Sequence, residues 1–362
     1  MPESRNIPTD SNMEPLAGIK PGFASWPEIT GHDKSSVLAL HAQLLFSQWM
    51  DPERFRSYQL RQLERMLRFA GKISSHYQPA LKFLESIPTG ELYAEQLAFI
   101  PVLSCGELQK NDQKIIARRR LPNHGRSRMV RIPKPTGSPV KMMMTGLVDA
   151  WGQALKLRGL EWNDSDLSLT HVRIHHGSDK HKAGAPRRRS VMPWSGPSHD
   201  LSADRPASDL LGELVRMNPG SVQAEPAVLE SLADLSVSQG IKPDNLREVH
   251  CRSRYLDPGL RKLVEDAWGV PVIHEYFLEE VGVIAQQCAE QGQLHVNSEF
   301  VYAEVLDDNN MPCSTGKAGR VVVTPLQNFQ TPLIRYDTGS FATWGEPCNC
   351  GRTLPVIHPI SV

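Results

Sequence analysis

Hydrophobic positions in the first third of the chain follow a helical spacing. Apolar residues recur three or four positions apart between residues 52 and 70, with arginine and glutamate between them: Phe55, Leu60, Leu63, Met66, Leu67 and Ala70. This spacing predicts an amphipathic helix that packs on a larger body. Asp51 is the expected N-cap, because Pro52 suits the first helical position. We predict a mainly helical N-terminal part at residues 33–117.

From residue 208 onward, helical and strand-like patterns alternate. Helices are predicted at 208–217, 227–239 and 258–268, and strands at 246–252 and 270–274. This alternation indicates a parallel sheet covered by helices. Ligands bind at the carboxyl ends of strands in such sheets, and residues 276–280 lie just past one of these ends.

After residue 300 the pattern becomes antiparallel. Two β-rich runs, 300–306 and 320–326, flank the turn-rich segment 307–319. The fold class is therefore predicted as α/β, with parallel sheets covered by helices and a distal antiparallel β region.

Composition excludes several classes of protein. Among the 362 residues, 40 Lys and Arg balance 40 Asp and Glu, so no overall charge favours nucleic acid or membrane. No apolar run approaches the roughly 18 residues that a membrane span needs. Residues 1–32 lack a signal-peptide pattern and are expected to form a flexible tail. Six cysteines in a chain of this length indicate a reducing, cytoplasmic compartment.

Two polar segments allow more than one interpretation. The basic segment 118–141 is either a solvated loop or a phosphate-binding loop, with Thr136, Gly137, Ser138 and Lys141 as suitable donors. Residues 175–208 lack an apolar period and are predicted to form a long loop. Its histidines are irregularly spaced, so we assign them no metal.

Four residues near the C-terminus suit a metal ion. Cys288 and His295 are separated by six residues, and Cys348 and Cys350 by one. Three thiolates and one imidazole suit tetrahedral zinc in a structural site. The alternative is that three buried thiols and a surface histidine are unrelated.

Several motifs together resemble a known family. In order they are RQLERMLRFAGKISSHYQPAL, IPVLSCGELQKN, PTGSPVK, EYFLEEVGVIAQQC, PLIRYDTGS and CNCGRTLP. They are similar to motifs of the adenylate-forming superfamily, in particular its phenylacetate–CoA ligase-like branch. The resemblance covers residues 40–358 and is strongest from Leu246 onward. It also supports the four zinc ligands.

The resemblance implies that a carboxylic acid reacts with ATP to give an acyl-adenylate, from which a thiol such as coenzyme A then displaces AMP. It places Thr136, Gly137, Ser138 and Lys141 along the ATP phosphates, with Lys141 and Glu280 as catalytic residues and Glu280 holding Mg²⁺. Tyr276 would pack on the adenine, and Arg335 and Ser340 would belong to the nucleotide site. The implied partners are a small-molecule carboxylic acid, a separate C-terminal domain or carrier protein, and optionally a second copy of the chain in a homodimer.

The chain also departs from the family pattern. Ile132, Pro133, Lys134 and Pro135 replace the small residues that begin the phosphate loop, and each proline removes a backbone donor. Lys134 is available there as a point charge. Ser340 replaces an aspartate and Phe277 a glycine. We expect one large domain at 33–362, with the nucleotide and zinc region at 270–362, and expect the family's mobile C-terminal domain to be absent. Two alternatives to an active ligase are therefore a catalytically impaired, zinc-stabilised binding or regulatory subunit and half of a split ligase.

Overall fold

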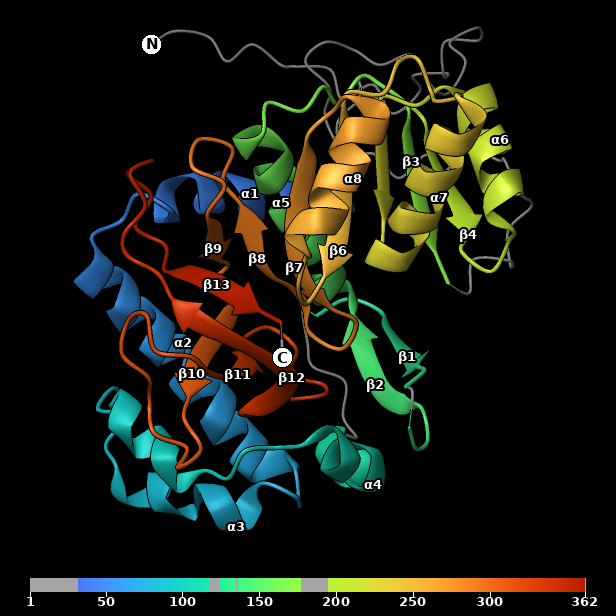
Figure 1. Ribbon diagram of the computed structural model, residues 1–362. Helices are drawn as coiled ribbons and strands as arrows, with labels where there is room; N and C mark the ends of the chain where they lie inside the picture. Colours follow the sequence, from blue (N-terminus) through green and yellow to red (C-terminus); the bar gives the residue numbers. More distant parts are fainter. Residues whose placement is uncertain (1–31, 118–123, 135, 177–194, 362) are drawn as a thin grey trace, which may run out of the picture.

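The computed structural model describes residues 32–117, 124–134, 136–176 and 195–361 (Figure 1). The predicted tail, apart from its last residue, lies outside the described residues, as do the middle of the predicted 175–208 loop and part of the basic segment. None of the described helices combines the length and apolarity that crossing a bilayer requires.

The N-terminal part is helical, as its periodicity predicts. It contains α1 (His32–Ser47), α2 (Pro52–Ile73), α3 (Gln78–Leu81), η1 (Lys82–Ser86), η2 (Ala94–Phe99) and α4 (Cys105–Ile115). The predicted cap of α2 is confirmed, because the Asp51 carboxylate accepts a 2.9 Å hydrogen bond from the Arg54 amide. Ser104 and Glu107 form a capping box that fixes the start of α4.

A small antiparallel hairpin and a long helix follow. Strands β1 (Ser127–Ile132) and β2 (Val140–Thr145) form a separate two-stranded sheet, and α5 (Gly146–Trp162) begins directly after β2. Thr145 caps this helix through its hydroxyl. The hairpin loop is the segment interpreted as a phosphate-binding loop.

The described strands other than β1 and β2 form one mixed sheet. Its order is β10-β11-β12-β13-β9-β8-β7-β6-β5-β3-β4. The parallel half contains β3 (His171–His175), β4 (Ser198–Ser202), β5 (Ser221–Ala224), β6 (Glu248–Ser253) and β7 (Val272–Leu278). The antiparallel half contains β8 (Gly282–Gln287), β9 (Leu294–Val296), β10 (Val301–Leu306), β11 (Gly319–Pro325), β12 (Tyr336–Trp344) and β13 (Val356–Ile360). The predicted α/β class is confirmed, and both kinds of strand belong to one sheet.

The long loop predicted at 175–208 is partly wrong, because β4 lies inside it. The segment SHDLS is too polar to show a strand period, yet it pairs in parallel with β3 at the sheet edge. Only Leu201 and Ser202 in this strand are buried. Edge strands need little apolar surface, which explains why the pattern was missed.

Three helices cover one face of the parallel strands. They are α6 (Ala207–Met217), α7 (Pro226–Gln239) and α8 (Pro258–Trp268), which Figure 1 shows side by side in front of the sheet. Their apolar faces and the facing strand residues form one core. Asn218, Gly240 and Gly269 end these helices in the left-handed conformation that helix C-termini favour.

The opposite face of the same strands is unusually polar. The buried His250 lies 2.9 Å from a Glu248 oxygen and 3.5 Å from a Glu275 oxygen. Lys156, from α5, reaches within 3.2 Å of the His171 ring, and burial lowers the pKa of this lysine to about 8. Parallel sheets are normally apolar on both faces. Here the buried charged side chains compensate one another as pairs.

Candidate functional site

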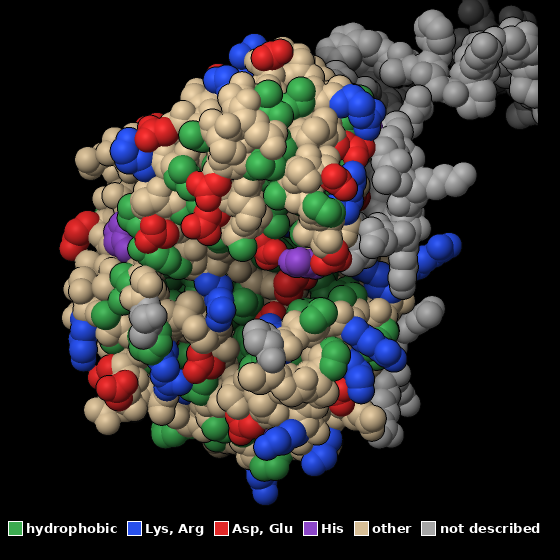
Figure 2. All heavy atoms as spheres, turned by 45° about the vertical axis from the view of Figure 1, so that its right-hand side comes forward, with side chains coloured by type: hydrophobic (Ala, Val, Ile, Leu, Met, Phe, Trp, Pro, Cys, Tyr) green, Lys and Arg blue, Asp and Glu red, His purple; other side chains and the backbone are tan. Residues whose placement is uncertain are grey.

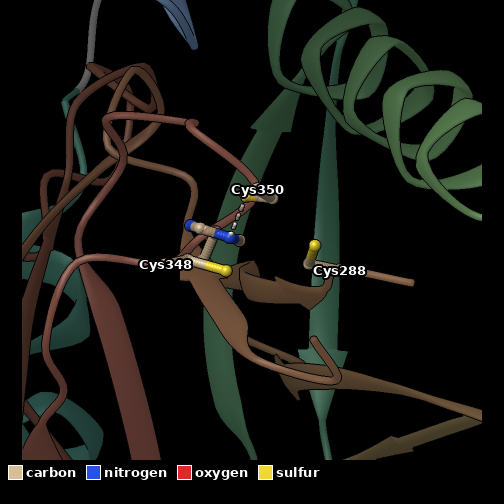
Figure 3. A group of neighbouring side chains, drawn as sticks. Cys288, Cys348 and Cys350 are labelled. Atoms are coloured by element: carbon tan, nitrogen blue, oxygen red, sulfur yellow. Dashed lines mark hydrogen bonds between the residues drawn. The ribbon is translucent and has the colours of Figure 1, made fainter. Parts of the chain in front are cut away.

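The structure brings together the four predicted metal ligands. Cys288 follows β8, His295 lies on β9, and Cys348 and Cys350 belong to the turn between β12 and β13. Their ligand atoms all lie within 4.8 Å of one another. Figure 3 shows Cys348 and Cys350 on one turn, with Cys288 on a separate segment beside them. Three sulfurs and one ring nitrogen match the donor set of structural zinc sites.

The His295 ring is already oriented for coordination. Its Nδ1 donates to the Leu354 carbonyl over 3.0 Å, while Nε2 lies 3.4 Å from the Cys350 sulfur. A metal-binding histidine usually donates its other ring nitrogen in this way, which fixes the tautomer. Burial lowers the pKa of His295 and so favours the neutral form that binds metals.

Arg352 supplies positive charge beside the thiols. Its guanidinium lies over the rings of Trp49 and Trp162, at 5.2 and 4.8 Å, and donates to the Cys288 sulfur over 3.6 Å. Three thiolates around one divalent ion would carry a net negative charge, and Arg352 is placed to offset it. Sequence analysis missed this residue, although its place two positions after Cys350 was visible.

The predicted phosphate loop forms the exposed tip of the β1–β2 hairpin. The Gln109 side chain of α4 donates to the carbonyls of Thr136 and Ser138, over 3.0 and 2.6 Å. Gly137 adopts a positive φ of 77°, and a Cβ there would lie 2.7 Å from Gln109 Oε1. Lys141 lies 3.5 Å from Asp112 on α4. The loop is therefore held against α4 by its carbonyl oxygens.

Glu280 lies in a buried cluster with two residues from distant segments. The ammonium of Lys134, from the β1–β2 loop, is 2.6 Å from Glu280 Oε1. The Tyr336 hydroxyl of β12 donates to the same oxygen over 2.6 Å. Burial, followed by the charge of Glu280, raises the pKa of Tyr336, which keeps this hydroxyl protonated. From the sequence, Lys134 was expected only as a point charge in the altered phosphate loop, and Tyr336 was not identified.

Tyr276 and Ser340 bond to each other. The two hydroxyl oxygens are 2.5 Å apart, and Ser340 also lies 2.7 Å from the Thr338 hydroxyl. Tyr276 is fully buried. Arg254, after β6, donates to the carbonyls of Thr338 and Gly339, both over 3.4 Å. These contacts close the region where the resemblance places the adenine and ribose.

Arg335 points away from this cluster. Its guanidinium pairs with Glu304 at 3.1 Å and donates to the carbonyls of Leu97 and Ile100, over 2.9 and 2.6 Å. The residue is buried and has a positive φ of 48°. Arg335 therefore connects the start of β12 to the N-terminal helices.

A hollow crosses the middle of the surface in Figure 2, with acidic and histidine side chains at its margin. His176 and Glu225 directly follow β3 and β5, and Asp204 is the second residue after β4. His176 bonds Asp204 at 2.6 Å and Glu225 at 2.7 Å. The hydrogen bond to Asp204 is the main cause of the raised pKa of His176. Sequence analysis gave this histidine no role, because the two carboxylates lie far from it along the chain.

The sequence matches no protein-family model and no curated protein. The fold, in contrast, is similar to crystal structures of 2-hydroxyisobutyryl-CoA ligase. With the complex containing 2-HIB-AMP and CoA in the thioesterification state, the TM-score is 0.68 at 18% identity, over 86% of this chain and 69% of that one. With an open conformation in complex with the same two ligands, the TM-score is 0.67 at 16% identity, over 86% and 70%.

Proposed function

We propose that this chain, which has the fold of the adenylate-forming ligases, activates a small carboxylic acid with ATP as an acyl-adenylate. The observation that carries the proposal is the cluster of Lys134, Glu280 and Tyr336. It joins the β1–β2 loop, the segment after β7 and β12, three segments that the motif resemblance assigns to one nucleotide site. The similar ligase, in its crystal structures, holds 2-HIB-AMP and CoA.

In this proposal the protein mainly positions charge. The acid carboxylate attacks the α-phosphate, pyrophosphate leaves, and a thiol such as coenzyme A then displaces AMP. Lys134 and Lys141 border the β1–β2 loop and would face the phosphate oxygens, whose charge grows during the transfer. Thr136, Gly137 and Ser138 would lie along the phosphates. Ser340 and Tyr276 would meet the ribose and adenine once their mutual hydrogen bond opens, and Arg335 would support this site from behind.

The remaining components follow from the same proposal. Zinc would occupy the three-cysteine and one-histidine site and tie β8 and β9 to the turn before β13. The proposed protein partner is either a separate C-terminal domain, which in the family carries the adenylation lysine, or a carrier protein. The protein would work in the cytoplasm, either alone or as a homodimer, on an acid that could be aromatic.

ATP–pyrophosphate exchange with a panel of aryl and short acyl acids tests the proposal. At least one acid should support exchange, and Glu280→Gln should abolish it. Asp307→Asn is the matched control, because it also removes a carboxylate from its lysine, Lys317 at 3.3 Å, but on an exposed turn. The absence of exchange with every acid, together with no rise in melting temperature on adding ATP, would rule the activity out.

The second candidate is a binding or regulatory subunit without ATP turnover. One observation favours it: the hydrogen bond between Tyr276 and Ser340. This contact occupies the two hydroxyl groups that would otherwise be open to the ribose and adenine. This candidate predicts that a non-hydrolysable acyl-adenylate analogue raises the melting temperature while exchange stays undetectable with every acid.

A further inference from the structure

We propose that the ammonium of Lys134 takes the place of a divalent cation at Glu280, so that this site accepts a phosphate-bearing ligand without Mg²⁺. The exclusion of a metal from Glu280 rests on the geometry of the cluster. The statement about the phosphate-bearing ligand rests, in addition, on the proposed function.

The Glu280 carboxylate already has its charge compensated. Its side chain is 1% exposed, and Oε1 receives both the Lys134 ammonium and the Tyr336 hydroxyl at 2.6 Å. A buried carboxylate needs such a partner, because desolvation makes an unpaired charge very costly. A metal ion at Oε1 would either displace the ammonium or share the site with it, and one carboxylate can neutralise only one positive charge.

The space beside Glu280 is too small and too apolar for hydrated magnesium. Mg²⁺ requires octahedral coordination and usually keeps several water molecules. The cavity that Glu280 lines measures about 10 Å³, roughly the space for a single water molecule. Met142, Met144, Val281, Phe300 and Leu333 form much of its wall.

The second carboxylate oxygen leads to the same conclusion. Glu280 Oε2 is buried and has no hydrogen-bond partner among the described residues. One water molecule in the small cavity could donate to it. The cavity walls add the neutral side chains of Asn328 and Thr331 but no second carboxylate, and the cavity leaves no room for the several water molecules that Mg²⁺ usually keeps. The residues present therefore do not fit the metal that the resemblance assigns to Glu280.

The local sequence restricts the backbone at Lys134. This lysine stands between Pro133 and Pro135, and the residue before a proline is biased toward extended backbone. This bias reduces the number of backbone conformations that are open to the loop between β1 and β2. The side chain is 17% exposed, so part of it faces outward from the cluster. An ammonium has three donors, of which Glu280 takes one, and the remaining donors suit phosphate oxygens.

Manganese binding, counted by electron paramagnetic resonance, tests the exclusion of a metal. Wild-type protein should show no manganese binding that depends on Glu280. Lys134→Ala, which removes the ammonium and opens the space that its side chain fills, should bind one manganese ion, and the double variant Lys134→Ala with Glu280→Gln should lose it. Lys317→Ala frees Asp307 in the same manner on the surface and should behave like wild type. Glu280-dependent manganese binding by wild-type protein would overturn the proposal, as would its absence from a folded Lys134→Ala.

Calorimetric titration with ATP, first without added Mg²⁺ and then in excess Mg²⁺, tests the statement about the phosphate-bearing ligand. The affinity of wild-type protein for ATP should be the same in both, and Lys134→Gln should weaken ATP binding without Mg²⁺ by about tenfold or more. ATP binding that requires Mg²⁺ would overturn the statement that the site accepts a phosphate-bearing ligand without this metal. No ATP binding under either condition would refute the nucleotide function and leave the manganese result standing, so the two failures are distinguishable.

Discussion

The hydroxyl groups of Tyr276 and Ser340 lie 2.5 Å apart in the interior of the protein. Burial raises the pKa of Tyr276, so its hydroxyl remains protonated and can donate to Ser340. Thr338 bonds the same serine at 2.7 Å. A neutral hydroxyl that already has two neighbours is a weak acceptor for a ribose, compared with a carboxylate.

We therefore expect Ser340→Asp to raise the affinity for AMP by about tenfold, because a carboxylate can accept from Tyr276 and from a ribose hydroxyl together. Ser340→Ala is the control. It should lower stability by about 1 kcal/mol, since the Tyr276 hydroxyl loses a partner, without gaining affinity for AMP. Calorimetric titration measures the affinities. Equal affinity of Ser340→Asp and wild type would place the ribose elsewhere.

The cysteine and histidine cluster predicts one zinc ion per chain, measured by elemental analysis of the purified protein. Cys350→Ser should lose the metal and several kcal/mol of stability, since zinc binding contributes directly to folding. Cys313→Ser is the matched control, because this buried cysteine lies outside the cluster. A metal-free sample with an unchanged melting temperature would contradict the assignment.

Burial of His274 makes stability sensitive to acid. Desolvation lowers the pKa of this histidine to about 4, from 6.5. Above pH 6.5 the ring is neutral both folded and unfolded, and its burial carries no penalty. As pH falls from 6.5 toward 4, the unfolded chain takes up a proton that the folded chain does not. Stability should fall over this window by about 3 kcal/mol.

Urea denaturation at a series of pH values measures this effect. His274→Gln should reduce the loss of stability across the window, because glutamine cannot take up the proton. His274 and His358 line one cavity. His358 is exposed, so His358→Gln should leave the loss of stability between pH 6.5 and pH 4 as in wild type. If His274→Gln and wild type lose the same stability between pH 6.5 and pH 4, His274 is protonated in the folded protein.

The sequence predicted those features whose chemistry limits the residue types. Three cysteines and a histidine have few structural uses in combination, so their assembly could be anticipated from spacing and motif. Tyr336 was present in the same motif as Arg335, but its hydroxyl bonds Glu280, 56 residues away. Spacing along the chain cannot reveal such a contact. The polar strand β4 was missed because hydrogen bonding at a sheet edge does not require an apolar period.

Arg335 shows how a motif residue can serve the fold. Its backbone has a positive φ of 48°, its side chain contacts Glu304 and the carbonyls of Leu97 and Ile100, and burial raises the pKa of Glu304. Breaking a buried ion pair by removing one partner costs about 3–5 kcal/mol, because the remaining charge is uncompensated. Arg335→Met and Glu304→Gln should each destabilise the protein by about this amount.

A double-mutant cycle separates a structural role from nucleotide binding. Because the partners depend on each other, the double variant should be more stable than the sum of the single losses predicts. Urea denaturation gives the free energies, and ATP titration of the folded double variant gives the affinity. If Arg335 acts only in the fold, that affinity matches wild type. Additive losses of stability, together with a loss of ATP binding in Arg335→Met but not in Glu304→Gln, would instead place Arg335 in the nucleotide site.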